Sequence, residues 1–243
     1  MFFKSSLNAA LLAASSIALA SISHAQAVYY TAGHGDIGIE YELGSGEFEP
    51  HWHIGAGAVV DGTTLSSENE YASDQIIAWT TSVFAAPTGS ATWLGVSEGT
   101  DVFRMGNSSF PPNLGWATEE VGIETDWVGE TINIELTGWS GANPGEFALI
   151  AGGNALFSTF GGSTNSWVFD VAAGHAHAAF YFSDPGYYEL TFTWIGEHVV
   201  DGLVTGTGTF GFQAGAIPEP SSAAALAGLA SLGLVALRRQ RRA

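Results

Sequence analysis

Three short pairs of metal-competent residues occur in the chain, each with a single residue between its members. They are His34-Gly35-Asp36, His51-Trp52-His53 and His175-Ala176-His177. Side chains of a β-strand point to alternate faces, so both members of each pair would lie on one face. A neutral imidazole offers a nitrogen lone pair to a divalent cation, and a carboxylate offers an oxygen. The spacing therefore predicts a metal site.

The sequence contains no cysteine, so the available donors are nitrogen and oxygen. This set favours zinc, with copper and nickel as competitors. The simplest arrangement joins two of the pairs, namely His51, His53, His175 and His177. His34 and Asp36 then either contribute to that site or form a second, weaker one. A single His-x-His pair on an exposed strand more often binds nothing, so the prediction depends on the three pairs together.

The elements that must position these residues are β-strands. Short alternating runs recur between breaks rich in Gly, Asn, Pro and Ser, and no stretch of the body keeps a 3.6-residue period. Residues 28–216 therefore predict one antiparallel β-sandwich, immunoglobulin-like or jelly-roll-like, followed by a short C-terminal transmembrane helix. Beyond the two hairpins described next, we expect strands at 91–94, 131–136, 167–171 and 205–212.

The first predicted hairpin joins strands 34–43 and 47–54 through Gly44-Ser45, because glycine suits the first central position of a two-residue type II′ turn. This register places Asp36 opposite His53 on the polar side, with Ile37 opposite Trp52 on the apolar side.

The same register places His51 opposite Gly38, whose missing side chain leaves room for the ring. Glu40 falls opposite Glu49, which is unfavourable unless solvent or a cation screens the two charges. Pro50 predicts that the second strand lies at a sheet edge.

The second predicted hairpin spans 175–194. Its turn is Ser183-Asp184-Pro185-Gly186, in which Pro followed by Gly occupies the central positions. The alternation before the turn places His175 and His177 on one face, opposite Ala176, Ala178 and Phe180.

The body of the chain is strongly acidic, with 23 Asp and Glu against one basic residue, Arg104, a net charge of −22. This makes nucleic acid and anionic membranes poor partners and cations good ones, although acidity also serves solubility. We expect Arg104 to be a structural ion-pair partner. His198, near a predicted turn, is left out of the metal site.

Residues 1–27 are typical of a signal peptide, with Lys4, an apolar stretch over 7–20 and the cleavage pattern Ala25-Gln26-Ala27. The chain ends with Pro218-Glu219-Pro220, an apolar segment over 223–237 and a cluster of arginines. This order resembles the PEP-CTERM sorting signal of exopolysaccharide-producing Gram-negative bacteria, over 217–243. The resemblance implies a transient inner-membrane anchor at 223–237, processing by an exosortase, and delivery to the cell surface or extracellular matrix.

Within the body, segments 174–180 (GHAHAAF), 185–192 (PGYYELTF) and 33–37 (GHGDI) resemble the choice-of-anchor M domain of bacterial surface-anchored proteins. The similarity is greatest to PEP-CTERM members that the zinc-uptake regulator represses, which implies a role in zinc homeostasis. Phe180 departs from the pattern, since such repeats often carry Trp there, but this leaves the expected ligands untouched.

Three function classes follow. The leading hypothesis is a non-catalytic surface protein that binds zinc for acquisition or buffering, and that passes the metal to a zinc uptake system. The second is an extracellular metalloenzyme, since three histidines and an open coordination position can activate water for hydrolysis. The third is a matrix or adhesion protein of the exopolysaccharide layer. No serine or cysteine motif supports nucleophilic catalysis.

Overall fold

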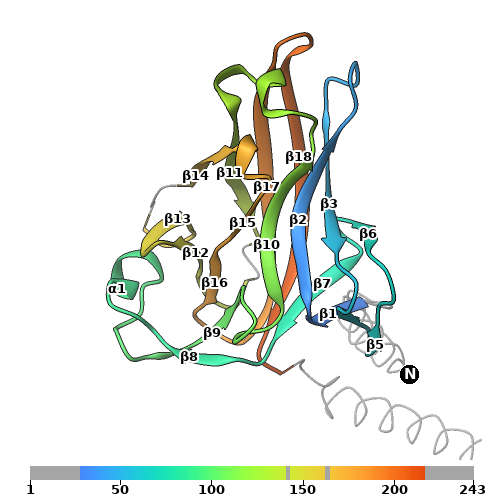
Figure 1. Cartoon of the computed structure of the whole chain (residues 1–243). Coiled ribbons are helices and arrows are strands. Elements are labelled where there is room, and N and C mark those ends of the chain that lie inside the picture. Colours follow the sequence, from blue (N-terminus) through green and yellow to red (C-terminus); the bar gives the residue numbers. More distant parts are fainter. Residues whose placement is uncertain (1–27, 141–142, 162–164, 217–243) are drawn as a thin grey trace, which may run out of the picture.

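The computed structural model describes residues 28–140, 143–161 and 165–216, and β-strands make up most of this part of the chain (Figure 1). The strands form three sheets, one of eight strands and two of five. The prediction of an all-β sandwich is therefore confirmed, and the finer immunoglobulin-like or jelly-roll-like assignment stays a prediction. The expected signal peptide (1–27) and the expected transmembrane segment (223–237) lie outside the described residues.

Sheet A carries the longest strands, β17 and β18, at its centre. Its order is β14 (Ser166–Asp170), β11 (Thr131–Trp139), β17 (Gly186–His198), β18 (Gly202–Ala214), β7 (Ile76–Thr80), β1 (Val28–Ala32), β4 (Val59–Val60) and β5 (Thr63–Thr64).

Sheet B holds all three histidine-containing pairs. Its order is β15 (His175–His177), β10 (Asn113–Glu120), β2 (His34–Tyr41), β3 (Phe48–Ile54) and β6 (Asn69–Ala72). Sheet C has the order β13 (Asn154–Ser158), β12 (Phe147–Ala151), β16 (Ala179–Phe182), β9 (Asp101–Met105) and β8 (Val83–Ala85). The helical elements are short: α1 (Ser90–Trp93), η1 (Glu124–Asp126), η2 (Val128–Glu130) and η3 (Val171–Ala173).

One tryptophan joins the three sheets in the core. Trp116 of β10 is fully buried, and its ring is stacked on Phe180 of sheet C with centroids 6.2 Å apart. The same ring meets Phe192 of sheet A edge-on at 4.9 Å. Aromatic burial of this kind supplies the stability that a chain without disulfides must draw from its core. The inner face of sheet B thus packs inward, and its opposite face carries the histidines.

The predicted register of β2 and β3 is confirmed, but the predicted turn is wrong. Asp36 pairs with His53, and Gly38 pairs with His51. The reverse turn runs from Glu42 to Ser45, closed by a 2.9 Å hydrogen bond from the Ser45 N–H to the Glu42 carbonyl. Gly44, with φ of 88°, therefore occupies the second central position, as in a type II turn, and the connection between the strands is longer than two residues.

The prediction that β3 lies at a sheet edge is wrong, since β6 pairs along its outer side. The pairing stops at Ala72, opposite His51, so Pro50 is not required to donate a hydrogen bond to β6. Pro50 instead packs on sheet A, where a Cβ on Gly208 would lie 2.7 Å from the proline ring.

The second predicted hairpin is also wrong. β16 pairs with β12 and β9 in sheet C, whereas β17 pairs with β11 and β18 in sheet A. The Pro185-Gly186 turn is consequently a corner between two sheets. Alternation of apolar residues showed that both segments are strands, but it carries no information about which strand each one pairs with.

Of the remaining strand predictions, those at 131–136, 167–171 and 205–212 are confirmed by β11, β14 and β18. Residues 91–94 instead lie in or next to α1, so this prediction is wrong; the turn-forming Pro87 and Gly89 precede that helix. The expectation of a purely antiparallel sandwich is corrected by three parallel pairs, β1 with β7, β7 with β18, and β2 with β10.

Arg104 makes no ion pair with the described residues, so that prediction is wrong. Its guanidinium lies over the rings of Phe84, Phe110 and Tyr181, at 4.8, 4.5 and 5.4 Å from their centroids. Cation–π contacts with aromatic rings stabilise the charge in place of a carboxylate.

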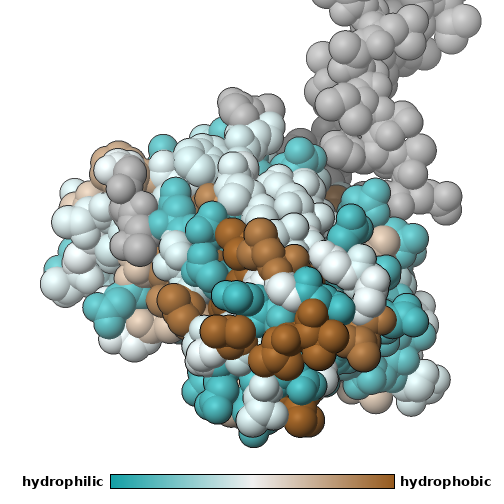
Figure 2. Space-filling view, turned by 90° about the horizontal axis from the view of Figure 1, so that it is seen from above, coloured by the Kyte–Doolittle hydropathy of each residue, from teal (hydrophilic) through white to brown (hydrophobic). Residues whose placement is uncertain are grey.

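Exposed aliphatic side chains gather at one end of the sandwich, where the β2–β3 loop, the η1–η2 segment and the β17–β18 turn meet. The brown patch in Figure 2 is this end seen from above. Contacts between the loops hold it together: the Gly44 N–H donates to the Asp201 carboxylate at 2.7 Å, and the Val199 N–H donates to the Asp126 carbonyl at 2.8 Å. The exposed members are Leu43, Ile123, Val128, Val199, Val200 and Leu203. Within the described ranges, no helix has the length and apolar character needed to span a membrane.

Candidate metal centre

The three pairs lie on one face of sheet B, but not in the expected order. β10 separates β15 from β2, and β3 follows on the far side of β2. Gly115 of β10 is paired with Asp36 on one side and with His177 on the other. The pair on β15 therefore meets His34 and Asp36 across β10, whereas His51 and His53 lie one strand further away.

Small residues on β10 make this meeting possible. Gly115 and Ala117 are the β10 residues that lie between the pair on β15 and the residues of β2. A Cβ at position 115 would collide with Oδ1 of Asp36 and lie 3.2 Å from Nε2 of His175. The side chains of β2 and β15 thus converge above a strand that presents almost no side chain of its own.

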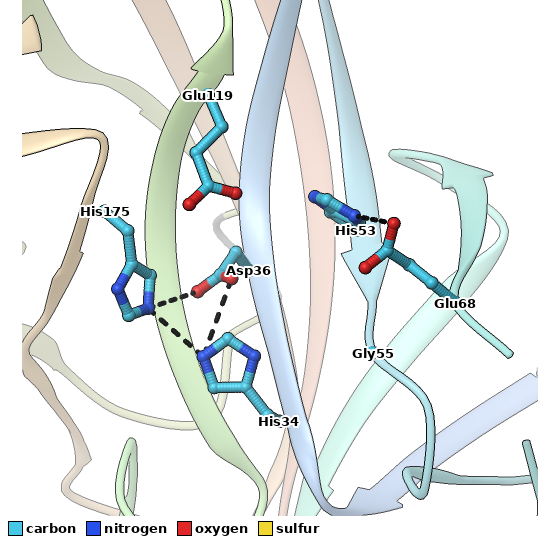
Figure 3. A pocket seen from close by; sticks show the side chains of 7 residues that line it. All are labelled: His34, Asp36, His53, Gly55, Glu68, Glu119 and His175. Atoms are coloured by element: carbon cyan, nitrogen blue, oxygen red, sulfur yellow. Dashed lines mark hydrogen bonds and ion pairs between the residues drawn. The ribbon is translucent and has the colours of Figure 1, made fainter.

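The three imidazoles of His34, His175 and His177 form a compact group of donors, with the Asp36 carboxylate beside the first two. Figure 3 shows His34, His175 and Asp36. Nε2 of His34 lies 3.1 Å from Nε2 of His175. Oxygens of Asp36 lie 3.4 Å from the His175 nitrogen and 3.7 Å from the His34 nitrogen. His177 completes the group, because one ligand atom from each of the three histidines lies within 4.8 Å of the other two.

The backbone orients one of these rings. Nδ1 of His177 lies 3.2 Å from the carbonyl oxygen of Leu114. When this nitrogen carries the proton it donates to the carbonyl, and the Nε2 lone pair is left free for a ligand. Metal-binding histidines in proteins are commonly held by such an outer hydrogen bond.

Asp36 is an unusual carboxylate for its position. It is only 4 % exposed, and its Oδ1 accepts no hydrogen bond from the described residues, although the His175 nitrogen lies 3.4 Å away. Burial raises the pKa of Asp36 to about 7; His53 opposes this shift and Glu119 adds to it. A buried carboxylate without a donor is unfavourable unless a cation or a proton neutralises it.

The imidazoles of the cluster favour the neutral form. Burial lowers the pKa of His34, and the neighbouring His175 and His177 lower it further. The pKa of His175 is also lowered, by burial and then by His177. Neutral imidazole is the form that binds a metal.

The two histidines of β3 have other neighbours. Nε2 of His53 lies 2.8 Å from Oε1 of Glu68, and Nε2 of His51 lies 3.1 Å from Oε2 of Glu120. Burial alone would lower the pKa of His53, but Glu68 and other nearby carboxylates raise it overall.

A cavity of about 230 Å³ connects the two groups. Figure 3 shows the side chains of β2, β3, β10 and β15 directed into it. Its lining includes two acidic residues that the sequence analysis did not select, Glu68 and Glu119. A β-bulge between Ala117 and Glu120 inserts an extra residue into β10. Alternation would separate Glu119 from Glu120, whereas the bulge brings both carboxylates near the histidines.

The structure therefore reverses the predicted priority among the pairs. His175 and His177 are joined by His34 and Asp36, which were expected to be secondary. His51 and His53 share the sheet face but do not enter the cluster. His198, which was left out of the site, is 5 % exposed and packs edge-on to the Trp127 ring at 5.2 Å, a structural environment.

Comparison with known families identifies one segment of the chain. Residues 216–242 match the PEP-CTERM protein-sorting motif. No curated protein and no solved structure matches the chain. The motif indicates an exported protein that is sorted to the cell surface or the extracellular space, and it implies processing by an exosortase-type enzyme.

Proposed function

We propose that this exported protein binds zinc through His34, His175, His177 and Asp36. The observation that carries the proposal is the spacing of the donors. Zinc bonds to nitrogen and oxygen of roughly 2.0–2.2 Å place neighbouring donors of a tetrahedral site about 3.3–3.6 Å apart. The separation of 3.1 Å between the two imidazole nitrogens, and those of 3.4 and 3.7 Å from Oδ1 and Oδ2 of Asp36 to His175 and His34, bracket this range. His177, whose ligand atom lies within 4.8 Å of those of His34 and His175, would supply the fourth donor.

The composition of the cluster supports the same ion. Three imidazoles and one carboxylate without sulfur suit zinc, and copper or nickel would compete for them. Four protein donors fill a tetrahedral site, which favours capture of the metal over catalysis at an open position. Burial raises the pKa of Asp36 to about 7, and a bound cation would stabilise its charged form.

The biological role that fits is zinc acquisition or buffering at the cell surface. The acidic body, with 23 acidic residues and Arg104 as its one basic residue, attracts cations to the molecule. The resemblance to the choice-of-anchor M domain, and to members that the zinc-uptake regulator represses, supports delivery to a zinc uptake system. Exopolysaccharide is a further partner that a surface location brings within reach.

A zinc titration of the full chain, stripped of metal in a non-ionic detergent, tests the proposal. We expect tight binding that is lost when His34, His175 and His177 are all replaced by Ala. The matched control replaces Glu49 and Glu98, exposed acids outside the cavity lining, by Gln and should retain tight binding. Equal affinity in the triple variant and the unmodified chain would contradict zinc binding at this cluster.

A metalloenzyme is the second candidate, and the cavity beside the cluster favours it. Glu119 lines that cavity together with His175, in a position to act as a general base for a metal-activated water. Release of Asp36 from the metal would open the required coordination position. Zinc-dependent hydrolysis of small esters, lost in a Glu119→Gln variant that still binds zinc, would favour this alternative.

A further inference from the structure

Three aromatic side chains gather on the outer face of sheet A, which is a different sheet from that of the histidines. They are Tyr29 of β1, Trp79 of β7 and Tyr187 of β17, and each has a fully buried neighbour in its own strand that points into the core. The rings of Tyr29 and Trp79 meet edge-on, with centroids 5.5 Å apart. All three side chains remain partly exposed. They form the aromatic platform of this face.

Gly211 of β18 makes room for the platform. It lies between β17 and β7, paired with Glu189 on one side and with Ile77 on the other. A Cβ at position 211 would lie 3.0 Å from the hydroxyl oxygen of Tyr187, so this side chain lies over the glycine. Burial raises the pKa of Tyr187, and the neighbouring Glu189 and Tyr29 raise it further. The two tyrosines therefore lie close together above a strand position that has no side chain.

A hollow of about 130 Å³ adjoins the platform, with Trp79 as part of its wall. The indole N–H of Trp79 donates to the Gly215 carbonyl at 2.7 Å, which holds the ring in place. The other lining residues are uncharged, and most carry a hydroxyl group: Thr31, Thr80, Thr81, Ser82 and Pro111. The buried Thr80 hydroxyl already donates to the Arg104 carbonyl at 3.1 Å, whereas Thr81 is exposed. The hollow thus offers an aromatic wall and hydroxyl groups that can both donate and accept.

An uncharged sugar matches both features of this surface. One face of a pyranose ring presents C–H groups, which are attracted to the negative face of an aromatic ring. The hydroxyl groups at the edge of the sugar need donors and acceptors, which threonine and serine side chains supply. The charged residues of the body are almost all acidic, yet no carboxylate lines the hollow. The surface therefore favours a neutral glycan over a cation, and the field of the body repels an anionic glycan.

We propose that the aromatic platform and the adjoining hollow bind a neutral glycan, with one sugar ring stacked on Trp79 and its hydroxyl groups paired with Thr81 and Ser82. Tyr29 and Tyr187 stack further units of the same chain, since they lie on other strands of the sheet. Stacking contacts add along a glycan, so an oligosaccharide binds more tightly than a single sugar. The site lies on sheet A, and binding there requires no zinc.

Calorimetric titration of the full chain with neutral linear hexasaccharides tests this proposal, in a detergent without a sugar headgroup and with a chelator present. The probes are cellohexaose, laminarihexaose and mannohexaose, and we expect at least one of them to bind. Trp79→Ala should weaken that binding by about tenfold or more, because the stacked ring is lost. Trp79→Phe keeps a ring and should lose less. The matched control is Trp139→Ala, which removes an exposed tryptophan of β11 and should bind as the unmodified chain does.

Thr81→Tyr is a second test, because a large side chain at this exposed position fills the hollow without disturbing the core. Its control is Thr88→Tyr, at an exposed threonine outside the lining. Thr81→Tyr should lose binding and Thr88→Tyr should keep it, with thermal unfolding verifying that each variant folds. The proposal is overturned if none of the three hexasaccharides binds, if Thr81→Tyr binds as well as its control, or if polygalacturonate oligomers bind more tightly than the neutral ones.

Discussion

Gly115 of β10 lies directly between Asp36 of β2 and His177 of β15, and the Asp36 carboxylate occupies the space that a side chain at position 115 would need. Two strands that are not neighbours can therefore bring their donors together across a third. In this arrangement a residue with no functional group determines whether the cluster can form.

Replacing Gly115 by Ala should weaken zinc binding at the cluster by roughly 10–100-fold, the range seen when a supporting residue of a metal site is lost. The added methyl group would displace the Asp36 carboxylate and crowd His175. Gly38→Ala is the comparison variant, since its methyl group would crowd His51 instead. Calorimetry should show zinc binding impaired only by Gly115→Ala; equal effects of the two variants would contradict this account.

The single histidine variants should rank differently from the order that the sequence alone predicts. His34→Ala and His175→Ala each remove a donor of the 3.1 Å pair, so we expect a loss of zinc affinity of more than about 100-fold. His51→Ala and His53→Ala should change the zinc affinity of the cluster by less than about threefold, because neither ring enters it. Competition with a chromophoric chelator measures all four variants, and the reverse ranking would count against the assignment.

The register of β2 and β3 could be predicted because alternation of buried and polar residues fixes which face each side chain occupies. The turn could not, since a two-residue loop and a longer loop can give the same pairing. The positive φ of Gly44 was compatible with either central position, and the hydrogen bond from the Ser45 N–H to the Glu42 carbonyl decides the second.

The partners within the site could not be predicted from the sequence. His34 and His175 are 141 residues apart, and they meet only because β10 pairs in parallel with β2 on one side and antiparallel with β15 on the other. Alternation identifies strands but not their neighbours. The glycine at 115 was the one local sign of a close approach over β10, and the bulge that redirects Glu119 left no sign in the sequence pattern.

Replacing Asp36 by Asn should stabilise the metal-free protein above pH 7. The pKa of Asp36 is raised by burial from 3.8 to about 7, so the folded state binds this proton more tightly than the unfolded state. The contribution of the protonated Asp36 side chain to the free energy of unfolding is therefore complete below about pH 4. It is lost as the pH rises to about 7, which lowers that free energy by on the order of 2–4 kcal/mol.

Chemical denaturation with a chelator present measures this effect. The Asp36→Asn variant should match the unmodified protein near pH 4 and exceed it at pH 8, while gaining less stability on addition of zinc. A variant that is less stable than the unmodified protein at pH 8 would contradict the account of Asp36 as an unsatisfied carboxylate.

Zinc binding should weaken as the pH falls below about 7. Asp36, with a pKa of about 7, takes up a proton first, and His34 and His175 follow at lower pH because their pKa values are lowered from 6.5. Calorimetry in buffers of different ionisation enthalpy should detect release of about one proton per zinc near pH 6.5 and close to none at pH 8.5. Proton release that persists unchanged in Asp36→Asn would show that another group supplies it.

Anomalous scattering at the zinc absorption edge, from crystals of the protein grown with one equivalent of zinc, tests the central claim most directly. The account predicts a peak bonded to Nε2 of His34, His175 and His177 and to the Asp36 carboxylate. A peak located only at His51 and His53, or no peak on this face of sheet B, would contradict it.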